Sequence, residues 1–184
     1  MKKMNNVRKV IVEEFSKWAV LSSFRRGPIR SREKVYELLS RLEYATLMDG
    51  PEINETEFMS WHRKNIQLIQ EKCKEKFGKE LPIGWGVKMI NMYLKTKVYI
   101  AQEKVRSGLV KMIHPPIDSY LWKGIENRYQ NDFEIISRTH VVRKIQDIDD
   151  YDAKYIKLIE GFKMIAKKEN CLLIEVEQFW QPTG

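Results

Sequence analysis

The sequence predicts an all-α protein, folded as one compact multi-helix domain over residues 1–184. Apolar residues recur every three or four positions in the long segments, which is the period of an amphipathic helix. Glycine, proline and helix-capping residues separate these segments at short intervals. A chain of 184 residues with 43% hydrophobic residues can also bury a core of its own.

Three helices are predicted before residue 80. The second begins after Ser31, and the third begins after Asn54, because both residue types cap free amides of a first helical turn. The third ends at Gly78 and contains His62, which we interpret as a surface or half-buried histidine, since no second metal ligand stands at helical spacing. The first helix has one apolar face, which we assign to the core: Val7, Val10, Ile11, Phe15, Trp18 and Leu21.

The second half of the chain continues the pattern. A fourth helix follows Leu81-Pro82 and carries its apolar positions as far as Val105. Two prolines at 115 and 116 keep the backbone extended, so Asp118 is the predicted N-cap of a helix over residues 119–128. A last strong helix contains Tyr155 to Ala166, and the run from Cys171 to Val176 predicts one short strand or a packed tail.

Charge indicates a polyanionic partner. Lys and Arg number 33 against 25 Asp and Glu, which gives a net charge of +8, and nucleic acid, with double-stranded DNA favoured, is therefore the expected partner. Neither an apolar run of membrane-spanning length nor a signal-peptide core occurs, so we expect a cytoplasmic monomer without a membrane partner. Two distant cysteines and no ligand cluster predict reduced thiols, with no metal and no cofactor.

Arginines gather around the predicted turn at Gly27-Pro28. Arg25, Arg26 and Arg30 could hold a DNA backbone through bidentate contacts with phosphates. The same cluster is equally consistent with a solvated junction between two helices.

The stretch from Leu81 to Lys88 predicts a tight turn that leads directly into a helix. Gly84 and Gly86 flank Trp85, and glycine allows another backbone to approach closely. The first amides of a helix have no internal partner and favour an anion. We therefore expect Gly84, Trp85 and Gly86 to bind a DNA phosphate.

This stretch resembles the hairpin of the helix-hairpin-helix DNA glycosylases. Gly84 to Lys88 is similar to the family's G-h-G-x-K pattern, where h is apolar, and Pro116-Ile117-Asp118 resembles its later apolar-Pro-apolar-Asp segment. Ile83 is one residue more than the family spacing, and the interval from Lys88 to Asp118 is long, as in an archaeal branch that removes oxidised guanine. The same two segments also resemble segments of uncharacterised bacterial proteins.

The resemblance implies base excision from DNA, in repair or in defence against modified phage DNA. Asp118 would stabilise the positive charge that develops on the sugar, and Lys88 would form a Schiff base if the enzyme is also a lyase. Alternatively, Lys88 pairs with a phosphate or is a surface lysine, and Asp118 is only a cap. An extruded base also needs aromatic neighbours, for which we propose Trp85, Tyr93, Tyr120 and Trp122.

Two other functions remain open at this stage. A helical nucleic-acid-binding protein without enzymatic activity explains the charge and the arginine cluster equally well. Four aromatic residues precede a basic passage from Arg138 to Lys144: Tyr120, Trp122, Tyr129 and Phe133. Together they could stack on bases and contact phosphates in either case, or they form a core with a charged rim. A helical ribonuclease is disfavoured because no Arg and His stand at the four-to-six-residue separation common in that class, Arg138 and His140 being too close.

Overall fold

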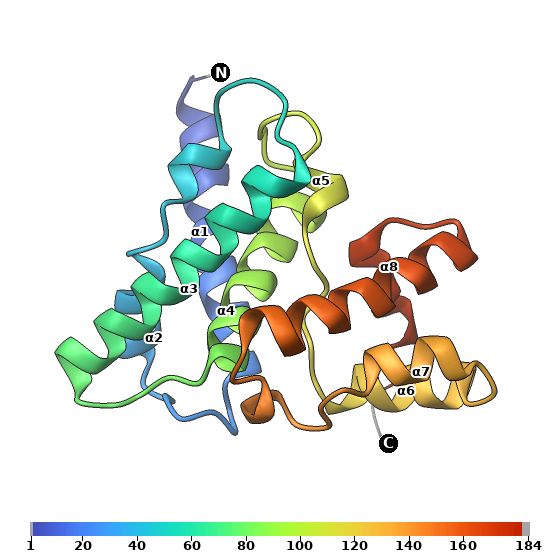
Figure 1. Ribbon diagram of the computed structural model, residues 1–184. Helices are drawn as coiled ribbons and strands as arrows, with labels where there is room; N and C mark the ends of the chain where they lie inside the picture. The colour runs from blue at the N-terminus through green and yellow to red at the C-terminus, as the bar shows by residue number, and fades with distance from the viewer. Residues whose placement is uncertain (1, 182–184) are drawn as a thin grey trace.

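A computed structural model describes residues 2–181 of the protein, with the side-chain surroundings of residues 7–181, and confirms the all-α class (Figure 1). No strand occurs among these residues. In chain order the elements are α1 (Lys2–Ser23), α2 (Arg32–Leu39), the 3-10 helix η1 (Tyr44–Leu47), α3 (Glu55–Phe77), α4 (Ile83–Leu94), the π-helical η2 (Lys95–Ile100), α5 (Leu109–Met112), α6 (Ser119–Tyr129), α7 (Phe133–Thr139), the 3-10 helix η3 (Ile145–Asp147), the π-helical η4 (Tyr151–Ile156), α8 (Lys157–Glu169) and the 3-10 helix η5 (Leu173–Phe179).

The helices begin and end where the capping residues predict. Ser31 and Asn54 accept hydrogen bonds from amides of the first turns of α2 and α3, and Asp118 does so for α6. Gly78 ends α3 with φ of +60°, a conformation that glycine adopts without steric cost. None of the described helices combines the length and the apolar character that crossing a bilayer requires. Both cysteines are free, as predicted.

Two predicted elements differ in the structure. The segment from Cys171 to Val176 is not a strand, because the 3-10 helix η5 occupies it and packs against α6 and α8. A lone strand would leave its backbone groups unpaired, whereas this turn satisfies them locally, with Glu175 accepting the amide of Leu172. The fourth helix also ends earlier than predicted, since helical structure stops at Ile100 and Val105 lies in the following loop.

Most of the apolar face of α1 points outward, which corrects its assignment to the core, although Leu21 packs against the core as predicted. Five of its side chains have exposed fractions between 49% and 62%: Val7, Val10, Ile11, Phe15 and Trp18. The opposite face is buried through Ser16 and Val20, and the Ser16 hydroxyl donates to the carbonyl of Val12 at 2.7 Å. Because that hydroxyl is satisfied within its own helix, a serine can lie inside. The helical period of apolar residues identifies an apolar face, but it does not show whether that face packs on the core or points to solvent.

A buried polar network joins the two sides of the molecule. Helices α1 to α4 lie on one side and α6 to α8 on the other (Figure 1). Between them His62 of α3 contacts the Tyr151 hydroxyl of η4 at 2.8 Å and the Asn91 side-chain oxygen of α4 at 2.9 Å. His114 contacts the Tyr155 hydroxyl at 2.7 Å. His62 is fully buried, so its prediction as a surface or half-buried residue is wrong.

Burial and hydrogen bonding in this network favour neutral histidines. Asn91 Nδ2 donates to the carbonyl of Pro115 at 3.0 Å and to the Tyr155 hydroxyl at 3.1 Å, so its Oδ1 faces His62. His62 Nε2 must therefore donate, and Nδ1 of a neutral ring accepts from Tyr151. Burial lowers the pKa of His62 to about 4 and that of His114 well below its ordinary value, since both rings are shielded from water.

This network predicts a loss of stability at mildly acidic pH. The folded pKa of His62 is depressed, so its contribution to stability is present above the unfolded pKa of about 6.5 and disappears as the pH falls toward 4. The loss from His62 should be on the order of 3 kcal/mol. Urea unfolding between pH 7 and pH 4.5 measures it. His62→Gln should flatten this dependence more than His140→Gln, and a free energy of unfolding independent of pH over this range would contradict the prediction.

Candidate functional site

A groove with a volume of about 930 Å³ opens where α1, α4, α6, η5 and the loop before η3 meet. Among the described residues that line it, six are basic and two are acidic. The acidic residues are Asp118 and Glu177, and the basic residues are Arg25, Arg26, Lys88, Lys95, Arg143 and Lys144. Five aromatic side chains complete the lining: Trp18, Trp85, Tyr120, Trp122 and Trp180. The groove therefore combines positive charge with flat apolar surfaces.

Lys88 and Asp118 meet within this groove. The Lys88 Nζ lies 3.7 Å from Asp118 Oδ2, although the two residues belong to α4 and to the N-terminus of α6. Asp118 Oδ1 accepts hydrogen bonds from the amides of Tyr120 at 3.0 Å and Leu121 at 3.1 Å. The indole of Trp180 donates to Oδ2 at 3.2 Å. One carboxylate oxygen thus caps α6, while the other faces the lysine.

Burial changes the acid-base properties of Lys88. Its side chain is only 9% exposed, and burial lowers the pKa of its amine, although the nearby Asp118 carboxylate raises it and limits the shift. The amine also lies 5.7 Å from the centre of the Trp85 ring, as in a cation–π contact. A lysine with a lowered pKa loses its proton more readily than a surface lysine and can act as a nucleophile.

A second ion pair lies in the same groove. The Lys95 Nζ is 2.6 Å from Glu177 Oε1. Burial raises the pKa of Glu177, and the attraction of Lys95 opposes this increase only partly. The groove therefore holds the Glu177 carboxyl group, which keeps its proton to higher pH than usual, and the Lys88 amine, which releases its proton at lower pH than usual. Groups whose pKa values move toward each other are suited to proton transfer.

The aromatic residues form both the walls and the rim of the groove. Trp85 and Trp122 are 8% and 5% exposed, and the Trp122 indole donates to the carbonyl of Thr139 at 2.8 Å, which fixes its ring. Tyr120 and Trp180 meet edge to face with ring centres 5.5 Å apart. Trp180 is 39% exposed, so its ring is available to a ligand.

The structure brings most of the sequence-predicted site residues into the groove. Seven of them line it: Arg25, Arg26, Trp85, Lys88, Asp118, Tyr120 and Trp122. Tyr93 lies elsewhere, because its hydroxyl donates to Glu13 at 2.8 Å beside Lys97, and its assignment to a base pocket is wrong. Arg30 also lies outside the groove and donates to the carbonyl of Gly27 at 3.3 Å, where it closes the local turn.

The predicted phosphate-binding turn at Gly84 and Gly86 is wrong. Both glycines lie inside α4, and the loop that joins α3 to α4 covers residues 78–82 instead. The Gly84 amide donates to the carbonyl of Ile148 at 3.0 Å. A Cβ at position 84 would lie 1.8 Å from the carbonyl oxygen of Ile145. Gly84 therefore permits close packing of η3 on α4, and this packing leaves no open notch for an anion at that residue.

Several groove residues were absent from the predicted site. Arg143 and Lys144 carried a partial signal, since they belong to the basic passage that sequence analysis associated with phosphates. Five further lining residues were not predicted. Met92 and Lys95 follow Lys88 in the same helical segment, whereas three reach the groove from distant segments and had no local signal: Trp18, Glu177 and Trp180. Trp18 was assigned to the core on periodicity.

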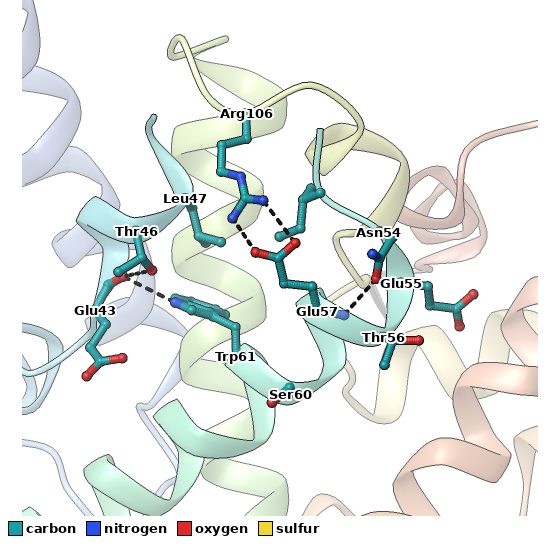
Figure 2. A pocket seen from close by; sticks show the side chains of 11 residues that line it. Glu43, Thr46, Leu47, Asn54, Glu55, Thr56, Glu57, Ser60, Trp61 and Arg106 are labelled. Atoms are coloured by element: carbon teal, nitrogen blue, oxygen red, sulfur yellow. Dashed lines mark hydrogen bonds and ion pairs between the residues drawn. The ribbon is translucent and has the colours of Figure 1, made fainter. Parts of the chain in front are cut away.

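A second cavity, of about 780 Å³, lies beside η1 and the start of α3 (Figure 2). Figure 2 shows the guanidinium of Arg106 turned toward the Glu57 carboxylate, with contacts of 2.5 and 2.9 Å, and the Trp61 indole bonded to the Glu43 carbonyl. Glu43, Glu55 and Glu57 give this cavity an excess of negative charge. It is therefore less suited to a polyanion than the groove.

Within the described part of the chain, no group of three or more His, Cys, Asp and Glu side chains is arranged to hold a metal ion. Comparisons with protein-family models, with curated proteins and with solved structures find no match to this chain. The chemistry of the groove therefore rests on its own geometry.

Substitution of Gly84 tests whether this position is packed or open. Gly84→Ala should lower the free energy of unfolding by roughly 3 kcal/mol or more, because the new methyl group collides with the backbone of η3. Gly86→Ala is the matched control in the same helix, since its Cβ would lie 3.2 Å from the Ile66 Cγ2 methyl group, a contact that a shift of a few tenths of an ångström relieves. Chemical denaturation of both variants measures the difference, and equal stabilities would contradict the close packing at Gly84.

Titration of Lys88 tests the electrostatics of the groove. The pKa of Lys88 should lie below the value of about 10.4 that is usual for lysine. Asp118→Asn should lower it further, because the carboxylate favours the charged amine. NMR of reductively ¹³C-methylated protein measures both values, with Lys88→Arg identifying the resonance. Titration together with the exposed lysines, or an upward shift in Asp118→Asn, would contradict this description.

Proposed function

We propose that the protein binds nucleic acid in the groove and excises a base there as a DNA glycosylase, with Lys88 and Asp118 as the catalytic residues. The observation that supports this most strongly is the 3.7 Å approach of the Lys88 amine to the Asp118 carboxylate in a basic, aromatic groove. The resemblance to the glycosylase family selected the same two residues. Because the predicted turn at the two glycines is absent, the resemblance supports the proposal only through Lys88 and Asp118.

The proposed chemistry uses both side chains. As the bond between base and sugar breaks, its electron pair leaves with the base and positive charge develops at the sugar C1′. The Oδ2 of Asp118 would stabilise this charge. The neutral amine of Lys88 would then form a bond to C1′ and pass a proton to Asp118, while the departing base takes a proton from water. Breaking of the C1′–O4′ bond, with return of the Asp118 proton to O4′, would open the sugar ring and give a Schiff base. The lowered pKa of Lys88 favours the neutral amine that this step requires.

Side chains, rather than helix amides, would hold the phosphates. Arg25 and Arg26 follow α1, and Arg143 and Lys144 precede η3, so the two pairs come from separate segments of the groove lining. Guanidinium groups can bind phosphate oxygens through two hydrogen bonds each. An extruded base could lie against Tyr120 and the exposed ring of Trp180, which meet edge to face at the rim.

A non-enzymatic nucleic-acid-binding protein is the second candidate. The capping of α6 by Asp118 Oδ1 favours it, because that role explains the aspartate without any reaction. The basic groove would bind phosphates equally well in such a protein. The two candidates differ in whether a base is released, and a covalent bond to Lys88 is expected only if the enzyme is also a lyase.

Borohydride trapping distinguishes the two candidates. The protein is incubated with oligonucleotides that carry oxidised, alkylated or phage-type modified bases or an abasic site, and borohydride then reduces any Schiff base to a stable adduct. We expect an adduct with the wild-type protein and with Lys111→Met, which changes an exposed lysine outside the groove. Lys88→Met should give none, because the nucleophile is missing.

Asp118→Asn tests the carboxylate separately. Asparagine also caps helices well, so α6 should remain folded while the charge next to the sugar is lost. Base release should fall by about 100-fold or more. Asp132→Asn, at the N-cap of α7, controls for capping effects. Nucleic-acid binding without base release or trapping from the whole panel, unchanged in both Lys88→Met and Asp118→Asn, would support the non-enzymatic candidate instead.

A further inference from the structure

Two aromatic rings on the outer face of α1 continue the groove lining. Phe15 and Trp18 are 49% and 52% exposed. Their rings stack, with centres 5.6 Å apart and an angle of 24° between the planes. Trp18 belongs to the lining of the groove, whereas Phe15 lies one helical turn farther from it along α1. The flat surface of the groove therefore extends beyond its rim.

These rings have no structural role in the core of the described chain. The core side of α1 is formed by Ser16 and Val20, each with no exposed surface. An aromatic pair that is half exposed leaves apolar area in water, and such patches usually mark a binding surface. The arrangement of two adjacent rings on one helix face thus calls for a ligand with flat apolar faces.

The surrounding charges favour an anionic ligand. Arg25 and Arg26, just beyond the end of α1, line the same groove as Trp18. Glu14 also lies between the aromatic and aliphatic parts of this face, but Lys17 Nζ is 3.3 Å from its carboxylate and Arg32 is 3.8 Å away. Its charge is therefore balanced locally. Aromatic rings beside phosphate-binding cations are the combination by which proteins bind unpaired nucleotides.

On the basis of the proposed function, we propose that Phe15 and Trp18 form a stacking platform for unpaired bases of the strand that enters the groove. The substrate is then single-stranded nucleic acid, or a duplex that is opened around the target base. A closed duplex hides the faces of its bases in the stack, so it gains nothing from exposed rings. This proposal names the state of the substrate, which the Lys88 and Asp118 pair leaves open.

The apolar face also extends away from the groove through Val7, Val10 and Ile11. These aliphatic side chains would suit a second copy of the chain better than a base. The proposal assigns the aromatic end to nucleic acid because Trp18 is shared with the basic groove. A second copy of the chain that binds the whole outer face of α1 is the competing occupant, and the test includes this outcome.

The test compares the affinities of a labelled single strand and of a duplex that contains the same strand, by fluorescence anisotropy. The double variant Phe15→Ala/Trp18→Ala should weaken single-strand binding by about tenfold or more and duplex binding by less than about twofold. Val10→Ala/Ile11→Ala is the matched control, because it removes apolar area from the same face without removing a ring. It should leave both affinities unchanged. Arg25→Ala/Arg26→Ala should weaken both.

The outcomes separate this inference from the proposed function. Single-strand affinity that is unchanged in Phe15→Ala/Trp18→Ala, or equally reduced in Val10→Ala/Ile11→Ala, overturns the platform while groove binding stands. Sedimentation that shows a dimer dissociated by Phe15→Ala/Trp18→Ala also overturns it, because a second copy then covers the face. Failure of both the single strand and the duplex to bind overturns both proposals. Platform-dependent binding without base release or borohydride trapping supports the platform and rejects base excision.

Discussion

The hydrogen bond from the Asn91 side chain to the carbonyl of Pro115 is the constraint on which the groove depends. Asn91 lies on α4 three residues after Lys88, and Pro115 lies three residues before Asp118. The hydrogen bond between Asn91 and Pro115 therefore places Lys88 and Asp118 side by side. Because Asn91 is itself held by His62 and Tyr155, the position of the candidate catalytic pair is fixed by packing between the two sides of the molecule.

Two opposing effects set the character of the groove. Burial favours the uncharged forms of both Lys88 and Glu177, whereas each has a partner of opposite charge that favours the ionised form. In both cases burial has the larger effect, so the pKa of Lys88 is lowered and the pKa of Glu177 is raised. The same groove exposes arginines at its rim, where solvent and phosphates can reach them. Its interior is suited to proton transfer and its rim to attraction of a polyanion.

Local sequence signals predicted the helix boundaries, but not which side chains from distant segments come into contact. The caps at Ser31, Asn54 and Asp118 act within one helical turn, so each could be found without knowledge of the fold. The pairing of Lys88 with Asp118 could be expected only through a family resemblance. His62 was misplaced because its partners are Tyr151 and Asn91, which no spacing in the sequence connects to it. The outward face of α1 and the roles of Glu177 and Trp180 depend equally on distant segments.

A glycine can be required at a position either for phosphate recognition or for close packing, and at Gly84 the structure shows close packing. Its missing side chain admits the backbone of η3, and its amide is already bonded to Ile148. Any homologous protein that keeps this contact must also keep glycine here. An alignment would then display an invariant glycine beside a lysine, which is the pattern normally attributed to phosphate recognition. In this lineage such invariance would instead reflect the distance between a helix and the loop that covers it, and it would persist even after loss of every ligand.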